Sequence, residues 1–182
     1  FCRADFMEAV GRLVRLIRRH RPEVMTAYDT FGGYGHPDHI QVNRVGTAAF
    51  FGASDLGRFP LEDGEEPWQP AKLYWVTWPR ERTRRRRRMA AEAGEITPEE
   101  AEREPDSGTP DEHISTYVDV APWFDRKWGA IMAHRTQIAE ASWVMALPED
   151  VRRAAFGREA FIRVFSRVDA PEDAPDLFAG LR

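Results

Sequence analysis

The 182 residues suit a single folded domain, because 42% of them are hydrophobic and the length is enough to bury a sizeable core. The net charge of −4 excludes a global electrostatic attraction to nucleic acid or to an anionic membrane, and no apolar run approaches the ~20 residues that a membrane helix needs. Cys2 is the single cysteine, so an internal disulfide is excluded and a reducing, cytoplasmic location is expected.

An amphipathic helix is predicted near the start of the chain. Asp5 and Glu8 have the spacing of a capping box, and Pro22 ends the helix. The arginines on its outer faces, Arg18 among them, are expected to lie in solvent. Residues 24–28 then predict a short buried strand. The apolar face of the helix comprises residues at helical spacing: Phe6, Val10, Leu13, Val14 and Ile17.

The stretch after this strand concentrates the chemically active side chains. His36 is expected to cap a helix that begins at Pro37 and continues to about residue 54. His36 and His39 are three residues apart, so their rings can share one side of the first turn of that helix. The junction lies at the carboxyl end of a strand, where open α/β sheets bind ligands. Three glycines allow the backbone the tight, positive-φ turns that it demands: Gly32, Gly33 and Gly35.

These residue types suit metal and proton chemistry. Neutral imidazole is a common zinc ligand, and an aspartate such as Asp38 often orients a neighbouring histidine. The alternative is that His36 only caps the helix and that the glycines only turn the chain. Because two histidines and an aspartate occur together behind the glycine turn, we favour the functional interpretation.

A highly charged segment at residues 80–110 interrupts the succession of predicted helices and strands. Residues 84–88 are five consecutive arginines, which can mark a nucleic-acid-binding surface. Six glutamates follow closely and can neutralise the arginines, and no aromatic residue is interleaved to stack on bases. We therefore expect an exposed excursion near the mouth of the site, mobile or disordered, with a helix that begins at Thr97 and Pro98.

The succession of helices and strands predicts the fold class. A strand, a loop and a helix after an earlier helix favour an α/β fold, with a Rossmann-like, mostly parallel sheet and flanking helices in one domain, residues 1–182. His134 would lie on the helix after the third strand; a single histidine on a helix is more often structural than a pocket residue, so we do not assign it as a ligand. The other elements are a loop at 60–71, strands at 72–78, 113–120 and 161–168, and helices at 122–138 and 148–155.

The segment Gly32-Gly33-Tyr34-Gly35-His36-Pro37-Asp38-His39 resembles the second signature of the LmbE-like, or PIG-L, zinc-dependent N-deacetylases. The likeness is greatest to the actinobacterial mycothiol enzymes, namely the deacetylase of mycothiol biosynthesis and the mycothiol S-conjugate amidase. It is close over residues 21–45 and loose over most of the chain, including residues 114–138. The first signature of the family, an Ala-His-Pro-Asp-Asp-Glu-like segment that supplies two metal ligands and the general base, does not occur in this sequence. We therefore expect an N-terminally incomplete chain, the C-terminal portion of one LmbE-like deacetylase domain.

The resemblance implies roles for four residues. His39 is the metal ligand, with Zn²⁺ or another divalent metal as the cofactor, and His36 is the oxyanion stabiliser or general acid. Asp38 orients His36 and keeps it basic, and Tyr34 contacts the substrate or the tetrahedral intermediate. The implied reaction is hydrolysis of an N-acetylated amino sugar to acetate and a free amine. Because the second signature supplies one metal ligand, the isolated chain is expected to bind zinc weakly or not at all and to have little activity.

Three alternatives stay open. Gly35 before His36 is more typical of the deacetylase than of the conjugate amidase, but one residue does not separate the two. A non-catalytic remnant would keep the fold as an interaction or oligomerisation module. A nucleic-acid binder that uses residues 84–88 is the least favoured. We expect a small-molecule partner, no nucleic acid and no membrane, and the sequence leaves the oligomeric state open.

Overall fold

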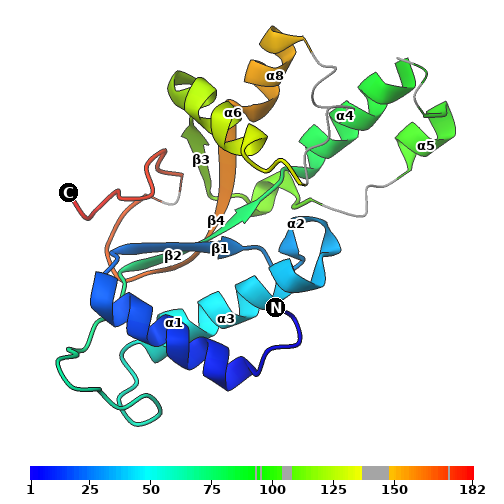
Figure 1. Ribbon diagram of the computed structural model, residues 1–182. Helices are drawn as coiled ribbons and strands as arrows, with labels where there is room; N and C mark the ends of the chain where they lie inside the picture. The colour runs from blue at the N-terminus through cyan, green and yellow to red at the C-terminus, as the bar shows by residue number, and fades with distance from the viewer. Residues whose placement is uncertain (93, 95, 104–107, 137–147, 172) are drawn as a thin grey trace.

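The computed structural model describes residues 1–92, 94, 96–103, 108–136, 148–171 and 173–182. The described strands form one four-stranded sheet in the order β1-β2-β4-β3 (Figure 1). The strands are β1 (Val24–Tyr28), β2 (Lys72–Thr77), β3 (Thr116–Asp119) and β4 (Arg158–Ser166). The helices are α1 (Phe6–His20), α2 (Gly32–Gly35), α3 (Pro37–Gly52), α4 (Arg80–Glu92), α5 (Pro98–Glu102), α6 (Phe124–Met132) and α8 (Glu149–Phe156), with short 3-10 helices η1 (Asp111–His113) and η2 (Ala121–Trp123).

The sheet is mixed, with one parallel pairing and two antiparallel pairings among the described strands. β1 and β2 are parallel, whereas β4 is antiparallel to both of its neighbours, β2 and β3. Among the described strands, β1, β2 and β3 therefore share one direction and β4 is reversed. Val120, just after β3, donates its N–H to the carbonyl of Gly157, just before β4 (2.8 Å), so the chain leaves one strand and enters the next at the same end of the sheet. The predicted α/β fold is confirmed, and three of the four described strands share one direction as expected for a mostly parallel sheet. Because the reversed strand β4 lies between β2 and β3, only the β1–β2 pairing is parallel.

The core lies between the sheet and two helices. α1 and α3 pack against each other on one face of β1 and β2 (Figure 1). α1 begins where the Asp5 carboxylate accepts a hydrogen bond from the Glu8 N–H (2.8 Å), and it ends at Arg21, whose φ of 48° is left-handed. The predicted first helix and its apolar face are confirmed, apart from Phe6, which is exposed. The buried cluster comprises Val10, Val14, Ile17, Val45, Ala49 and Ala53.

Arg18 differs from the expectation of a solvated side chain, because it is buried against the loop that follows α3. Its guanidinium donates to the carbonyls of Ala53 (3.0 Å) and Phe59 (2.7 Å) and pairs with Glu65 at 3.2 Å. Hydrogen bonds to the Glu65 carboxylate, first from the Glu62 N–H and then from Arg18, lower the pKa of Glu65. Arg18 therefore connects α1 to this loop. On the buried side of α1, it is a charged residue whose guanidinium is satisfied by hydrogen bonds.

The second half of the chain follows the predicted order with one shorter helix. α6 ends at Met132 rather than at the expected residue 138, and a hydrogen bond from the His134 N–H to the Ile131 carbonyl (3.1 Å) closes its last turn more tightly than an α-helical bond would. His134 is exposed beyond this turn, and residues 137–147 lie outside the described part of the chain. α8 and β4 match the predicted helix and strand to within a few residues.

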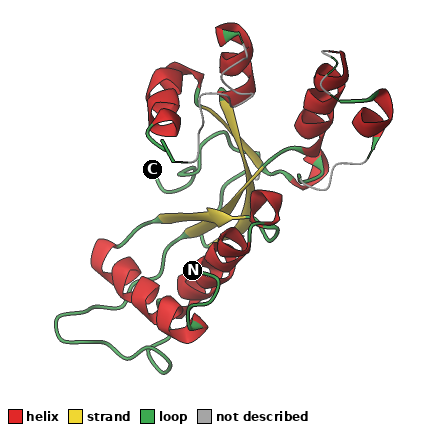
Figure 2. Ribbon diagram, turned by 45° about the vertical axis from the view of Figure 1, so that its right-hand side comes forward, coloured by secondary structure: helices red, strands yellow, loops and turns green. Residues whose placement is uncertain are grey.

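Residues 80–110 form an excursion whose two ends meet at the carboxyl end of β2. The Thr109 N–H donates to the Trp78 carbonyl (2.8 Å), and the Arg80 N–H donates to the Thr109 carbonyl (2.8 Å). We call this meeting point, residues 78–80 and 108–110, the neck. α4 and α5 stand away from the sheet in both Figure 1 and Figure 2. α5 begins with Thr97 as its cap and Pro98 at its first position, as predicted, and Glu100 completes a capping box. The mobility of the excursion stays a prediction.

Replacing Arg18 with alanine is expected to lower the free energy of unfolding by about 2–3 kcal/mol, because the buried carbonyl of Ala53 and the part-buried carbonyl of Phe59 lose their donor. Arg12→Ala is the control, since Arg12 pairs with Glu8 in solvent and such exposed pairs contribute less than ~1 kcal/mol. Urea unfolding of both variants measures the difference. Equal losses of stability would contradict the role assigned to Arg18.

Candidate active site

A tight turn joins β1 to α3 and places both histidines at the carboxyl end of β1. Its three glycines have positive φ values, 66° at Gly32, 76° at Gly33 and 86° at Gly35. A Cβ on Gly32 would lie 2.8 Å from the Ile40 nitrogen, so glycine alone fits there. The predicted order of strand, turn and helix is confirmed, and the turn includes the short helix α2.

A buried carboxylate, that of Asp29, holds this turn from the inside. Its Oδ1 accepts the N–H groups of Phe31 (3.1 Å) and Gly33 (2.9 Å), and its Oδ2 accepts the Thr77 hydroxyl (2.6 Å). The Thr77 hydroxyl is also 2.6 Å from the Thr109 hydroxyl, at the neck. Sequence reasoning gave Asp29 no role, although an aspartate that accepts the N–H two residues further on is a common way to start a turn. Asp29 thus joins the turn to β2 and to the neck.

His39 lies half-buried behind the turn. Its Nδ1 is 3.1 Å from the Gly32 carbonyl, which can only accept a hydrogen bond, so Nδ1 carries the proton and Nε2 keeps its lone pair. The ring stacks on Tyr28, with centroids 4.1 Å apart and planes 4° apart. These two contacts fix the ring and leave Nε2 as the nitrogen that is able to bind a cation.

The two ring nitrogens of His36 have the opposite roles to those of His39. Its Nδ1 accepts the Asp38 N–H (3.2 Å) as the predicted cap of α3, so Nε2 carries the proton of the neutral ring. His36 is exposed, and its ring centroid lies 5.0 Å from that of His39, with the planes 42° apart. The pair therefore offers one N–H donor and one lone pair close together.

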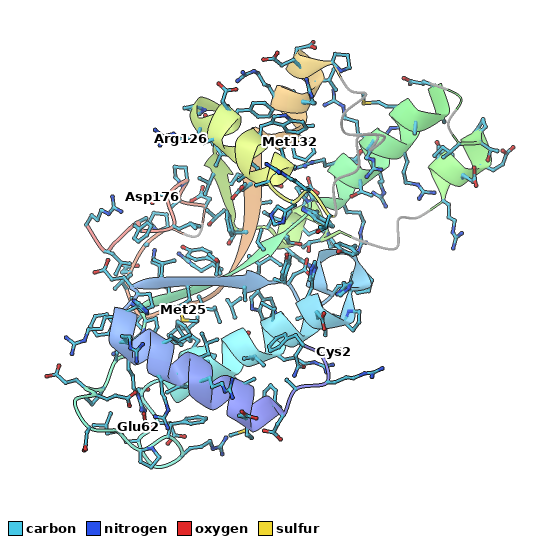
Figure 3. The ribbon with its side chains drawn as sticks, viewed as in Figure 1. Cys2, Met25, Glu62, Arg126, Met132 and Asp176 are labelled. Carbon is cyan, nitrogen blue, oxygen red and sulfur yellow. The ribbon has the colours of Figure 1, made fainter. Side chains whose placement is uncertain are left out.

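Asp38 contacts His36 through its backbone, whereas its carboxylate meets the first residues of the chain. Oδ1 accepts the Cys2 N–H (2.7 Å). This hydrogen bond lowers the pKa of the Asp38 carboxylate. Figure 3 shows Cys2 next to the start of α3. The orienting role implied for Asp38 stays a prediction, and its contact with His36 is the hydrogen bond that caps the helix.

Tyr34 lies beside both histidines. Its ring centroid is 5.1 Å from that of His39 and 6.1 Å from that of His36, and the residue is 55% exposed. Trp78, directly after β2, stacks on Tyr34 with centroids 5.9 Å apart and planes 5° apart. The structure thus brings together the four residues singled out from the sequence and adds Asp29 and Trp78, to which the sequence gave no role.

His39 supplies one nitrogen suited to a metal. Over the residues that the structure describes, no group of three or more His, Cys, Asp or Glu side chains is placed to hold a metal ion. Two surface hollows of about 280 and 310 Å³ lie elsewhere, one between α4 and α5 and one beside η1 and β4, and neither is lined by His36 or His39.

No family model matches the chain. The chain is 40% identical over 191 residues to the 1D-myo-inositol 2-acetamido-2-deoxy-alpha-D-glucopyranoside deacetylase of Nocardioides sp., covering 100% of this chain and 62% of the relative. It is 33% identical over 186 residues to the mycothiol S-conjugate amidase of Streptomyces coelicolor, covering 100% of this chain and 63% of that relative. The chain belongs to the LmbE-like, or PIG-L, family.

This membership confirms the resemblance predicted from residues 32–39. The LmbE-like chain spans less than two thirds of the length of the relatives that it matches. The conserved protein TT1542 of Thermus thermophilus has a similar fold, with a TM-score of 0.57, 21% identity, and coverage of 90% of this chain and 61% of that one. Within the described residues, no helix combines the length and the apolar character needed to cross a bilayer.

The two ring tautomers are directly testable. Long-range ¹H–¹⁵N NMR spectra recorded above neutral pH should show His39 protonated on Nδ1 and His36 protonated on Nε2, because one backbone partner fixes each ring. Gly32→Ala should leave His39 in a mixture of tautomers, since the new Cβ would clash with the His39 Cβ at 2.8 Å. His39 protonated on Nε2 in the unaltered chain would contradict the assignment.

Gly64→Ala is the matched control for the glycine substitution. Gly64 also has a positive φ, 81°, but a Cβ there meets nothing within 4 Å. The strain of the backbone is therefore similar in both variants, and only Gly32→Ala adds a collision with His39. The spectrum of His39 should be unchanged in Gly64→Ala.

Proposed function

We propose that this LmbE-like chain takes part in hydrolysis of the amide bond of an N-acetylated amino sugar, which yields acetate and a free amine. One observation carries the proposal: the rings of His36 and His39 lie 5.0 Å apart and have opposite states at Nε2. Two relatives, a deacetylase of an acetamido-sugar inositol and an amidase of mycothiol conjugates, support the same class of reaction.

His39 is proposed to supply one ligand to a zinc ion or another divalent metal. Its Nε2 keeps a lone pair because Nδ1–H is bound to the Gly32 carbonyl, and Tyr28 holds the plane of the ring. A bound zinc ion would acidify a water molecule and polarise the amide carbonyl. The resemblance assigns the other ligands to the first signature of the family, which does not occur in this sequence.

His36 is proposed to stabilise the oxyanion. The neutral ring presents Nε2–H, a donor for the carbonyl oxygen that becomes negative when water adds to the amide carbon. Only the cationic ring could deliver a proton to the departing amine. In that ring Nδ1 is protonated, so it can no longer accept the hydrogen bond from the Asp38 N–H. The cap of α3 therefore favours the oxyanion role over the general-acid role, the two roles that the resemblance leaves open.

Tyr34 is proposed to contact the substrate. The residue is more than half exposed, and its ring lies edge-on to His39, with an angle of 77° between the planes. A substrate whose carbonyl meets His36 would therefore lie against this ring. Asp38 is proposed to assist through the N–H that holds His36 in its Nε2–H form.

Gly35 before His36 is more typical of the deacetylase than of the conjugate amidase, so we propose an N-acetylated amino sugar as the substrate, with the mycothiol conjugate as its competitor in the assay. A non-catalytic interaction module is the alternative function, and it predicts no hydrolysis in the following assay.

The test joins the residues that precede the matching stretch in the Nocardioides relative to Phe1 of this chain. The zinc-loaded chimera should release acetate from N-acetylglucosaminyl-inositol faster than it hydrolyses a mycothiol conjugate. His36→Ala should lower kcat by about 10²–10³-fold with little change in KM, because the lost interaction forms in the transition state. His39→Ala should remove both bound metal and activity.

His20→Ala is the control, because His20 is an exposed histidine at the end of α1 and should be dispensable for activity. Cooperative thermal unfolding shows whether each protein is folded. A folded, zinc-loaded chimera that releases no acetate would overturn the proposed reaction and favour the non-catalytic module. A preference for the mycothiol conjugate would instead identify an amidase.

A further inference from the structure

We propose that Trp78 is a positioning residue that fixes the ring of Tyr34 beside His39. Its importance for the substrate rests on the proposed function, in which Tyr34 contacts the substrate. Its effect on Tyr34 is a separate claim that can be measured in the chain without any hydrolysis.

Tyr34 needs a support because its backbone does not provide one. The residue lies between Gly33 and Gly35, whose φ values are 76° and 86°, and its own φ of −135° and ψ of 21° are not helical. Its side chain is 55% exposed. A side chain on such a turn exchanges rotamers unless another group packs against it. The flat surface that runs parallel to the Tyr34 ring is the indole of Trp78, with planes 5° apart.

The backbone of Trp78 is held at the end of β2, while the side chain is 40% exposed. Its carbonyl accepts the Thr109 N–H (2.8 Å), and the preceding residue, Thr77, donates its hydroxyl to Asp29 (2.6 Å). The indole also packs on the backbone of Gly33, where a Cβ would come within 3.3 Å of the ring. Trp78 therefore contacts two consecutive residues of the turn, the backbone of Gly33 and the ring of Tyr34. This contact links the orientation of Tyr34 to the end of β2 and to the neck.

The position of Tyr34 can be measured at His39. The two ring centroids are 5.1 Å apart, so the ring current of Tyr34 contributes to the chemical shifts of the His39 ring protons. Trp78→Leu should move these shifts toward the values found in Tyr34→Ala. Trp78→Phe keeps an aromatic face and should restore shifts close to those of the unaltered chain. Adding Trp78→Leu to Tyr34→Ala should change the His39 shifts little further, because Trp78 acts through Tyr34.

Trp123→Leu is the matched control, since Trp123 is also exposed (56%) but lies in η2. Its spectrum should match that of the unaltered chain at His39. Urea unfolding shows which variants are folded. If Trp78→Leu is not folded, Trp78→Phe and the nuclear Overhauser contact between the rings of Trp78 and Tyr34 in the unaltered chain decide the question.

Unchanged His39 shifts in folded Trp78→Leu, equal changes with and without Tyr34, or no contact between the two rings would each overturn the proposal. These NMR measurements use the chain alone, so their result does not depend on whether the chimera hydrolyses its substrate. Failure of the reaction and failure of the positioning role are therefore distinguishable.

Discussion

The hydrogen bonds of the buried Asp29 carboxylate are the constraint on which the site depends. A carboxylate removed from water is costly unless donors surround it, and here the donors are the N–H groups of Phe31 and Gly33 and the hydroxyl of Thr77. Two of these donors belong to the turn and the third belongs to β2. The same group therefore closes the turn and fastens it to the neighbouring strand.

The backbone of this turn and of the first turn of α3 provides the hydrogen-bond partners of both histidine rings. The positive φ of Gly32 lets the chain reverse so that the Gly32 carbonyl meets Nδ1 of His39. His36 leaves the turn in an extended conformation and accepts the first exposed N–H of α3 through its own Nδ1. Two identical side chains three residues apart thereby acquire different chemistry, because backbone partners leave an N–H at Nε2 of His36 and a lone pair at Nε2 of His39.

Local features were predictable because near neighbours decide them. The Asp5 cap, the glycine turn and the helix that begins at Pro37 depend on residues within one turn of the chain. Contacts between distant segments were not predictable in this way. Thr77 reaches Asp29 across 48 residues, and nothing in the sequence states that β2 lies next to β1.

The same reason accounts for the other features that the sequence did not reveal. Arg18 has an ordinary helical environment in sequence, but its partners lie on a loop more than 30 residues away. Trp78 belongs to a predicted strand, and its stacking on Tyr34 depends on the parallel pairing of two strands. β4 is reversed because it begins next to the end of β3, where the Val120 N–H bonds to the Gly157 carbonyl, and the sequence does not reveal this contact. The roles proposed for the histidines come from the family signature, whereas the contacts that set their tautomers come from the structure.

The most direct test of this account is the tautomer of His39 in Asp29→Ala, measured by long-range ¹H–¹⁵N NMR. Asp55→Ala is the control, because Asp55 also accepts a backbone N–H, that of Arg58 (3.0 Å), in a turn away from the histidines. With the turn released, folded Asp29→Ala should show His39 as a mixture of tautomers, while Asp55→Ala keeps the proton on Nδ1. A His39 ring that stays protonated on Nδ1 in folded Asp29→Ala would contradict the central role of the buried carboxylate.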